Sequence, residues 1–157
     1  MHSIEFKNIV YRPDGKTILD CISLALPEGQ SMAIVGPSGC GKTTLGRLIA
    51  QILEPTSGEL FFAEGLTCRM VEQQDNFMTI SRLGSSYYGQ RYENQGMEQS
   101  PTILSYLQQT SENVEGVMDL LNIAHLKNSK LMMLSNGERK RTQLAEALLH
   151  YPDVLVL

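Results

Sequence analysis

The chain has 157 residues, of which 42% are hydrophobic and 19% are charged, a composition typical of a globular domain and not of a disordered chain. Its formal net charge of −4 gives no overall attraction for nucleic acid, so a nucleic-acid partner is not expected. Three cysteines without a C-x-x-C spacing argue against a disulfide framework or a zinc site, and they suit a reducing cytosol.

The first thirty residues predict an antiparallel β unit. Residues 3–10 alternate between apolar and polar side chains, as a half-buried strand does. The face expected to be buried carries Ile4, Phe6 and Asn8. A Pro-Asp-Gly turn at 11–16 leads into a second predicted strand at 17–26, and another turn follows at 27–30.

Residues 36–43 fit the pattern G-x-x-x-x-G-K-[ST]. They follow a predicted strand at 32–35 and lead into a predicted helix at 42–53, which is the context of a phosphate-binding loop. Glycines let the backbone wrap around a phosphate, and the loop N–H groups and the helix N-terminus form an anion site. Lys42 is expected to reach the β- and γ-phosphates, and the Thr43 hydroxyl to complete a Mg²⁺ shell. The expected phosphate-binding residues are Gly36, Pro37, Ser38, Gly39, Cys40, Gly41, Lys42, Thr43 and Thr44.

The second half of the chain predicts several short elements and one longer helix. Strands are expected at 59–62 and 66–71, loop at 72–100, and helices at 102–109 and 113–121. Ser135 and Glu138 have the spacing of a capping box, which starts a helix running to about His150. Its predicted apolar stripe consists of Leu144, Ala147 and Leu148. The apolar run 154–157 is expected to form a buried parallel strand.

Together with the phosphate loop, the stretch L-S-N-G-E at 134–138 resembles the signature of the ATP-binding-cassette (ABC) ATPases, which is usually L-S-G-G-Q. This resemblance implies an α/β, P-loop NTPase fold with an N-terminal antiparallel β unit, a central parallel sheet and a helical subdomain at roughly 86–134, all within one domain, 1–157. It implies ATP binding and, in the complete protein, ATP hydrolysis with Mg²⁺. Asn136 and Glu138 depart from the usual signature, but Asn tolerates left-handed backbone, so the loop geometry is expected to survive.

The resemblance also implies roles for individual residues. Tyr11 occupies the place of the aromatic residue that stacks on adenine; the alternative is an aromatic at the edge of a turn. Gln90 resembles the glutamine that contacts Mg²⁺ and the attacking water, with Gln73 and Gln74 as alternatives. The catalytic residues are then Lys42, Gln90 and Ser135. In the family, the residues that match Ser135, Asn136 and Gly137 contact ATP bound to an opposite cassette, although local helix capping alone would also explain Ser135 and Glu138.

These implied roles predict partners and a location. A second cassette, fused or homodimeric, would lie head to tail with this one, and a membrane-spanning transporter subunit is a further expected partner. The start of the chain does not resemble a signal peptide, and no apolar run could span a bilayer, so the expected location is the cytoplasm or the inner face of a membrane.

Three further expectations concern the subfamily and the end of the sequence. Residues 82–92 resemble soluble tandem-cassette proteins associated with molybdate transport. The family places a Mg²⁺-binding Asp and a catalytic Glu after the strand at 154–157, so the chain is expected to be an incomplete cassette that binds ATP with little turnover. The alternatives are a non-transport ABC protein, such as a ribosome-associated translation factor, and a P-loop kinase, which would not explain residues 134–145.

Overall fold

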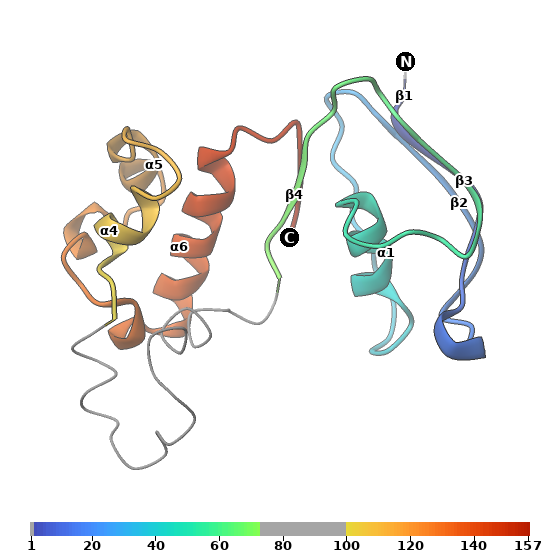
Figure 1. The fold of residues 1–157 in the computed structure, drawn as a ribbon, viewed down its shortest axis with the longest axis horizontal. Coiled ribbons are helices and arrows are strands. Elements are labelled where there is room, and N and C mark those ends of the chain that lie inside the picture. Colours follow the sequence, from blue (N-terminus) through green and yellow to red (C-terminus); the bar gives the residue numbers. More distant parts are fainter. Residues whose placement is uncertain (1, 73–99) are drawn as a thin grey trace, which may run out of the picture. The chain divides into compact units, whose positions relative to one another are not determined.

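The computed structural model describes residues 2–72 and 100–157 (Figure 1). The chain divides into two compact units. The first, called the α/β unit, comprises Met1–Met70 and Pro152–Leu157. The second, called the helical unit, comprises Val71–Tyr151.

An antiparallel sheet forms the first layer of the α/β unit. It contains β1 (His2–Tyr11), β2 (Leu19–Pro27) and β3 (Ser57–Phe62), with β1 in the centre among the described residues. The 3-10 turn η1 (Pro13–Gly15) connects β1 to β2. The predicted antiparallel β unit is therefore confirmed, and β3 extends it through an antiparallel pairing with β1.

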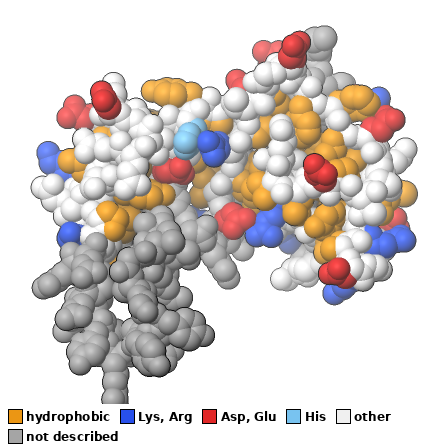
Figure 2. Space-filling model, viewed as in Figure 1, with side chains coloured by type: hydrophobic (Ala, Val, Ile, Leu, Met, Phe, Trp, Pro, Cys, Tyr) orange, Lys and Arg blue, Asp and Glu red, His pale blue; other side chains and the backbone are white. Residues whose placement is uncertain are grey.

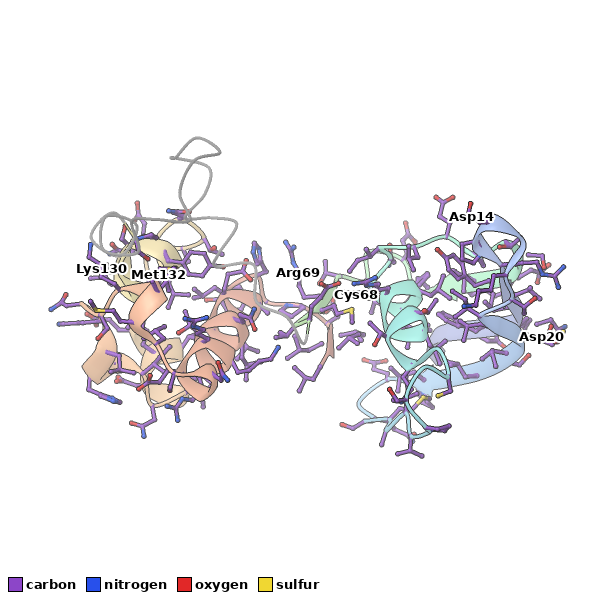
Figure 3. All side chains as sticks on the ribbon, turned by 90° about the horizontal axis from the view of Figure 1, so that it is seen from below. Asp14, Asp20, Cys68, Arg69, Lys130 and Met132 are labelled. Carbon is purple, nitrogen blue, oxygen red and sulfur yellow. The ribbon has the colours of Figure 1, made fainter. Side chains whose placement is uncertain are left out.

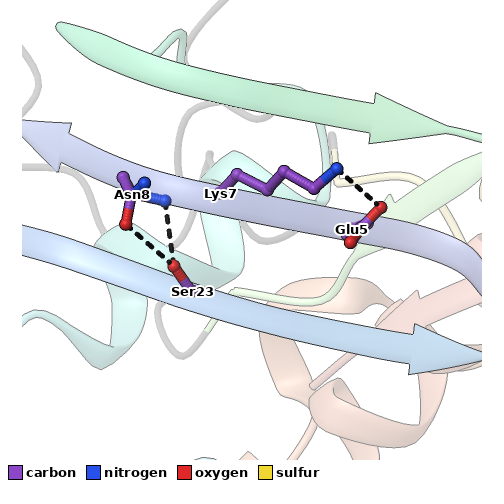
Figure 4. A network of polar contacts seen from close by, with 4 residues as sticks. All are labelled: Glu5, Lys7, Asn8 and Ser23. Carbon is purple, nitrogen blue, oxygen red and sulfur yellow. Dashed lines mark hydrogen bonds and ion pairs between the residues drawn. The ribbon is translucent and has the colours of Figure 1, made fainter.

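A β-bulge in β1 changes which residues face the core. Ile4, Phe6 and Ile9 are almost completely buried, whereas Asn8 is exposed with a φ of 51°. The prediction that Asn8 shares the buried face is wrong, because a bulge adds one residue to the strand and shifts the alternation. Instead, Asn8 exchanges hydrogen bonds with Ser23 on β2, donating from its backbone N at 2.9 Å and accepting at Oδ1 at 3.4 Å (Figure 4).

Helix α1 (Lys42–Ile49) and a short parallel ladder complete the α/β unit. The ladder pairs β4 (Cys68–Met70) with β5 (Val154–Val156), which confirms the predicted parallel strand near the C-terminus. A Cβ at Gly46 would lie 3.2 Å from the Cγ1 atom of Val156, so α1 packs tightly against β5 at this glycine. The side chains of β5 are half-buried and not buried as predicted, because the described ladder has only two strands.

Two boundaries around the phosphate loop differ from the predictions. The predicted strand at 32–35 does not form, and Val35 is 87% exposed. A strand needs a neighbour for its N–H and C=O groups, and no described strand pairs with this segment. Helix α1 ends at Ile49 and not at residue 53, since Gln51 has the left-handed φ of 58° that commonly follows a helix.

Asp153 fastens the start of β5 to the residue before β4. Its Oδ2 atom accepts hydrogen bonds from the backbone N and the hydroxyl of Thr67, both at 2.8 Å. These bonds from Thr67, the backbone one first, hold the pKa of Asp153 below its ordinary value of 3.8. The charged carboxylate therefore stabilises the folded chain above that value, and this contribution is lost as the pH falls below it.

We therefore predict that Asp153→Asn flattens the acid end of the stability profile. Urea denaturation between pH 5 and pH 2.5 should show a smaller loss of unfolding free energy for this variant than for the wild type. Glu28→Gln is the control, because Glu28 is an exposed carboxylate in the turn after β2. Equal pH slopes for the wild type and Asp153→Asn would contradict the assignment.

The helical unit contains α4 (Ile103–Leu107), α5 (Glu115–Leu120) and α6 (Asn136–Leu149), with 3-10 turns η3 (Ala124–Leu126) and η4 (Leu131–Met133). The predicted helices in these regions are confirmed, although α4 and α5 are shorter than expected. The core of this unit consists of Ile103, Leu107, Val114, Met118, Ile123, Leu131, Leu134, Ala145 and Leu149.

The buried stripe of α6 differs from the predicted one. Ala147 is buried as expected, but Leu144 and Leu148 are only half-buried. The side chains in the core are Ala145 and Leu149, so the stripe is displaced by one residue around the helix. None of the described helices is long and apolar enough to cross a membrane.

Candidate nucleotide-binding site

The phosphate loop of the α/β unit has left-handed backbone at two glycines before α1. Gly39 has a φ of 81° and Gly41 a φ of 94°, and Gly41 is the N-cap residue of α1. The first helical bond runs from the N of Leu45 to the carbonyl of Gly41 at 2.9 Å. No side chain caps this end of α1, so its first N–H groups are available to an anion.

Steric contacts explain two of the glycines. A Cβ at Gly36 would lie 2.8 Å from Cys40 Sγ, and a Cβ at Gly41 would lie 2.7 Å from Leu19 Cδ2. The Gly41 position is also 3.2 Å from the carbonyl oxygen of Ile18. Both glycines therefore allow close packing within or against the loop, whereas Gly39 has open space around it and needs glycine only for its left-handed φ.

The ammonium of Lys42 lies within the loop. Its Nζ donates hydrogen bonds to the carbonyl oxygens of Gly36 at 2.9 Å and Pro37 at 2.7 Å. Cys40 Sγ lies 3.9 Å from the same nitrogen. The loop therefore places a positive charge among backbone carbonyls. Phosphate oxygens could replace these carbonyls as acceptors of the Lys42 hydrogen bonds. Chemically, this arrangement can bind and orient a phosphate chain.

Two further predicted ligands, Thr43 and Tyr11, also lie in the α/β unit. Thr43 is exposed in the first turn of α1, so its hydroxyl is open to solvent beside the loop. Tyr11 is half-buried at the end of β1, where it pairs with Leu19 and its carbonyl accepts from the N of Ile18 at 2.9 Å. Tyr11 and Gly41 therefore share Ile18 and Leu19 as neighbours, at the point where the chain enters β2.

The N-terminus of α6 in the helical unit carries the signature residues. Glu138 N donates to Ser135 Oγ at 3.5 Å, and Glu138 Oε2 accepts from the backbone N of Ser135 at 2.7 Å. The predicted capping box is thus confirmed. Asn136 begins α6 without a positive φ, so the left-handed tolerance expected to matter there is not needed. Residues 135–137 are exposed, and a Cβ at Gly137 would contact nothing.

Hydrogen bonds from Ser135 favour the ionised form of the Glu138 side chain. The hydrogen bonds from the Ser135 hydroxyl and backbone N, in that order, lower the pKa of the Glu138 carboxyl from 4.5. Arg141 and His125 lower it further by charge. At neutral pH a carboxylate therefore lies at the N-terminus of α6, where the helix dipole favours negative charge.

Arg139 is a structural residue of the signature that the sequence motifs did not indicate. Its Nε donates to the carbonyl of Leu134 at 3.0 Å, and one terminal nitrogen donates to the carbonyl of Met132 at 3.1 Å. Met132 is labelled in Figure 3. These bonds fasten the turn that leads into Ser135. A basic residue four positions after an N-cap serine was the available signal, because one helical turn brings it back beside the cap.

Other predicted features remain without a place in the structure. Gln90 and its alternatives Gln73 and Gln74 lie outside the described residues.

On the face drawn in Figure 2, acidic and basic side chains are interspersed on both units, without a continuous basic stripe. The expectation about nucleic acid stays a prediction.

Comparisons with known proteins relate this chain to one family. A family model described as "ABC transporter" matches residues 19–157. The chain is 33% identical over 160 residues to the zinc import ATP-binding protein ZnuC of Buchnera aphidicola. It is 30% identical over 154 residues to the Fe(3+) ions import ATP-binding protein FbpC of Escherichia coli O157:H7. Each alignment covers 98% of this chain, but only 59% and 44% of the respective relative.

Solved structures show the same fold. The chain matches cbiO1 from Clostridium perfringens, part of the ABC transporter complex cbiONQ, with a TM-score of 0.70 and 21% identity. That match covers 98% of this chain and 64% of the solved one. The predicted α/β fold with a phosphate loop is therefore confirmed. The chain spans about half the length of the curated relatives it matches.

Proposed function

Because this chain belongs to the ABC transporter family, we propose that it binds ATP with the loop at 36–44 and that the complete protein hydrolyses it to drive transport. The position of the Lys42 ammonium carries this proposal. It is held inside the loop by the carbonyls of Gly36 and Pro37, beside an uncapped helix N-terminus. Positive charge, loop N–H groups and the helix dipole then act together on the phosphates.

We assign the other residues of the α/β unit accordingly. Thr43 would contribute its hydroxyl to Mg²⁺, whose remaining ligands would come from phosphate and water oxygens. Magnesium supplies charge neutralisation on the β- and γ-phosphates when it is bound. Tyr11 would stack on the adenine ring, since it shares residues 18–19 as neighbours with the loop. Gln90 would orient the attacking water.

A second cassette would complete the site. The exposed N-terminus of α6 offers a hydroxyl at Ser135 and open N–H groups at Asn136 and Gly137, which suit a γ-phosphate. In the head-to-tail arrangement, this phosphate belongs to ATP held by the loop of the other cassette. The two ATP molecules would thus join the two cassettes, and Ser135 would stabilise the charge that develops during phosphoryl transfer.

The names of the relatives favour a role in transport over translation. ZnuC and FbpC are both named as import ATP-binding proteins. We therefore infer that the complete protein associates with a membrane-spanning subunit on the cytoplasmic side. A tandem arrangement of two cassettes and a link to molybdate are finer proposals based on residues 82–92, which lie outside the described part.

Nucleotide titration tests the first step of this proposal. Isothermal titration calorimetry of the purified chain with ATP and Mg²⁺ should give saturable binding of one nucleotide per chain, with weaker binding of AMP because it lacks the β- and γ-phosphates. Equal affinity for ATP and AMP would contradict a site built around Lys42.

A further inference from the structure

The hydroxyl of Ser135 already has an acceptor. Ser135 Oγ donates to Glu138 Oε2 at 2.7 Å, and the same carboxylate oxygen accepts from the Ser135 backbone N at 2.7 Å. An ionised carboxylate can only accept hydrogen bonds, so the proton between Oγ and Oε2 is the hydroxyl proton. A serine hydroxyl has one proton, and this one is used within the capping box.

We propose that Glu138 is a positioning residue that restrains Ser135 and so opposes ATP-driven association of two cassettes. This inference rests on the proposed function, in which Ser135 donates to the γ-phosphate of ATP on the opposite cassette. To donate there, Ser135 must first release Oε2 of Glu138. In the bound state the Glu138 carboxylate then loses one donor while it lies near a phosphate of like charge.

The geometry shows why glutamine in place of Glu138 would act differently. The glutamine side chain could still accept from the Ser135 backbone N through its carbonyl oxygen, so the capping box would be retained. Because both bonds end on the one oxygen Oε2, a glutamine carbonyl oxygen in that place could still accept from the Ser135 hydroxyl as well. A neutral amide oxygen accepts more weakly than a carboxylate and carries no charge that repels a phosphate, so Glu138→Gln weakens the hold on Ser135 without removing the cap.

The experiment compares four purified proteins: wild type, Glu138→Gln, Ser135→Ala and the double variant. Sedimentation velocity with AMP-PNP and Mg²⁺ measures association, and calorimetry measures nucleotide binding to the loop. We expect Glu138→Gln to strengthen nucleotide-dependent association by roughly threefold to tenfold, the size of a relieved interaction at an exposed helix end. Nucleotide affinity of the single chain should stay unchanged.

Two controls separate positioning from general effects. Glu146→Gln removes a carboxylate farther along α6, where Glu146 pairs with His150 at 3.0 Å, and should leave association at the wild-type value. In the Ser135→Ala background, Glu138→Gln should produce a clearly smaller gain, because the hydroxyl is absent and only the removal of the like charge remains.

Three results would overturn the inference. The first is that Glu138→Gln does not strengthen association although the wild type binds nucleotide and associates. The second is that Glu146→Gln strengthens association as much as Glu138→Gln. The third is a full gain in the Ser135→Ala background, which would assign the effect to direct charge repulsion. If the wild type does not bind AMP-PNP and its chains do not associate in the presence of AMP-PNP, the proposed function fails and this inference fails with it.

Discussion

Replacing Lys42 with alanine should weaken ATP binding by about tenfold to a hundredfold, the loss expected for charge-assisted hydrogen bonds to phosphate. In the structure, Lys42 Nζ is bound only to loop carbonyls and a nearby thiol among the described residues, so it can turn to the phosphates without breaking an ion pair. Calorimetric titration of the purified chain with ATP and Mg²⁺ measures the change.

The matched control for this variant is Lys7→Ala. Lys7 lies on β1 of the same unit, outside the loop at 36–44, and pairs with the Glu5 carboxylate at 3.5 Å (Figure 4). Lys7→Ala removes the same charge and the same number of side-chain atoms as Lys42→Ala, and it should leave ATP affinity within about twofold of the wild type. Loss of binding in both variants would mean that general charge, and not the position of Lys42, attracts the nucleotide.

Gly41→Ala should damage both stability and binding. A non-glycine residue at a φ of 94° is strained by about 1–2 kcal/mol. The new Cβ would also overlap Leu19 Cδ2 and approach the Ile18 carbonyl, which adds about 1–3 kcal/mol of overpacking. We expect a combined loss of about 2–5 kcal/mol in unfolding free energy by urea denaturation, together with weaker ATP binding.

Gly39→Ala isolates the steric part of that effect. Gly39 lies in the same loop with a similar φ of 81°, but nothing lies within 4 Å of a Cβ there. It should lose only the strain of about 1–2 kcal/mol. If the two variants are equally unstable, the contact of Gly41 with the start of β2 does not restrict that position.

Features that depend on residues close together in the sequence could be predicted from the sequence. Local signals succeeded: the capping box at Ser135 and Glu138 depends on residues three apart, and it is present. The phosphate loop is predictable from its glycines because the positive φ of Gly39 and Gly41 and the contact of Gly36 with Cys40 are set within the loop.

Features that depend on distant neighbours were predicted less well. The bulge at Asn8 is set by its pairing with Ser23 on β2, so alternation in β1 alone could not indicate it. Residues 32–35 are apolar, but apolarity does not supply the neighbouring strand that a ladder requires. The role of Arg139 is hard to predict because its acceptors are backbone carbonyls, so only its spacing of four residues from Ser135 indicates it.

The central claim is that the site is shared: the loop around Lys42 holds ATP, and Ser135 closes the site on another cassette. Ser135→Ala tests it most directly when ATP binding and ATP-dependent association are measured on the same preparation. The account predicts ATP affinity within about twofold of wild type, and association weakened by about tenfold or more. A shared site would be contradicted if the single Ser135→Ala chain bound ATP more weakly than the wild type, while its ATP-bound form associated as tightly as the ATP-bound wild type.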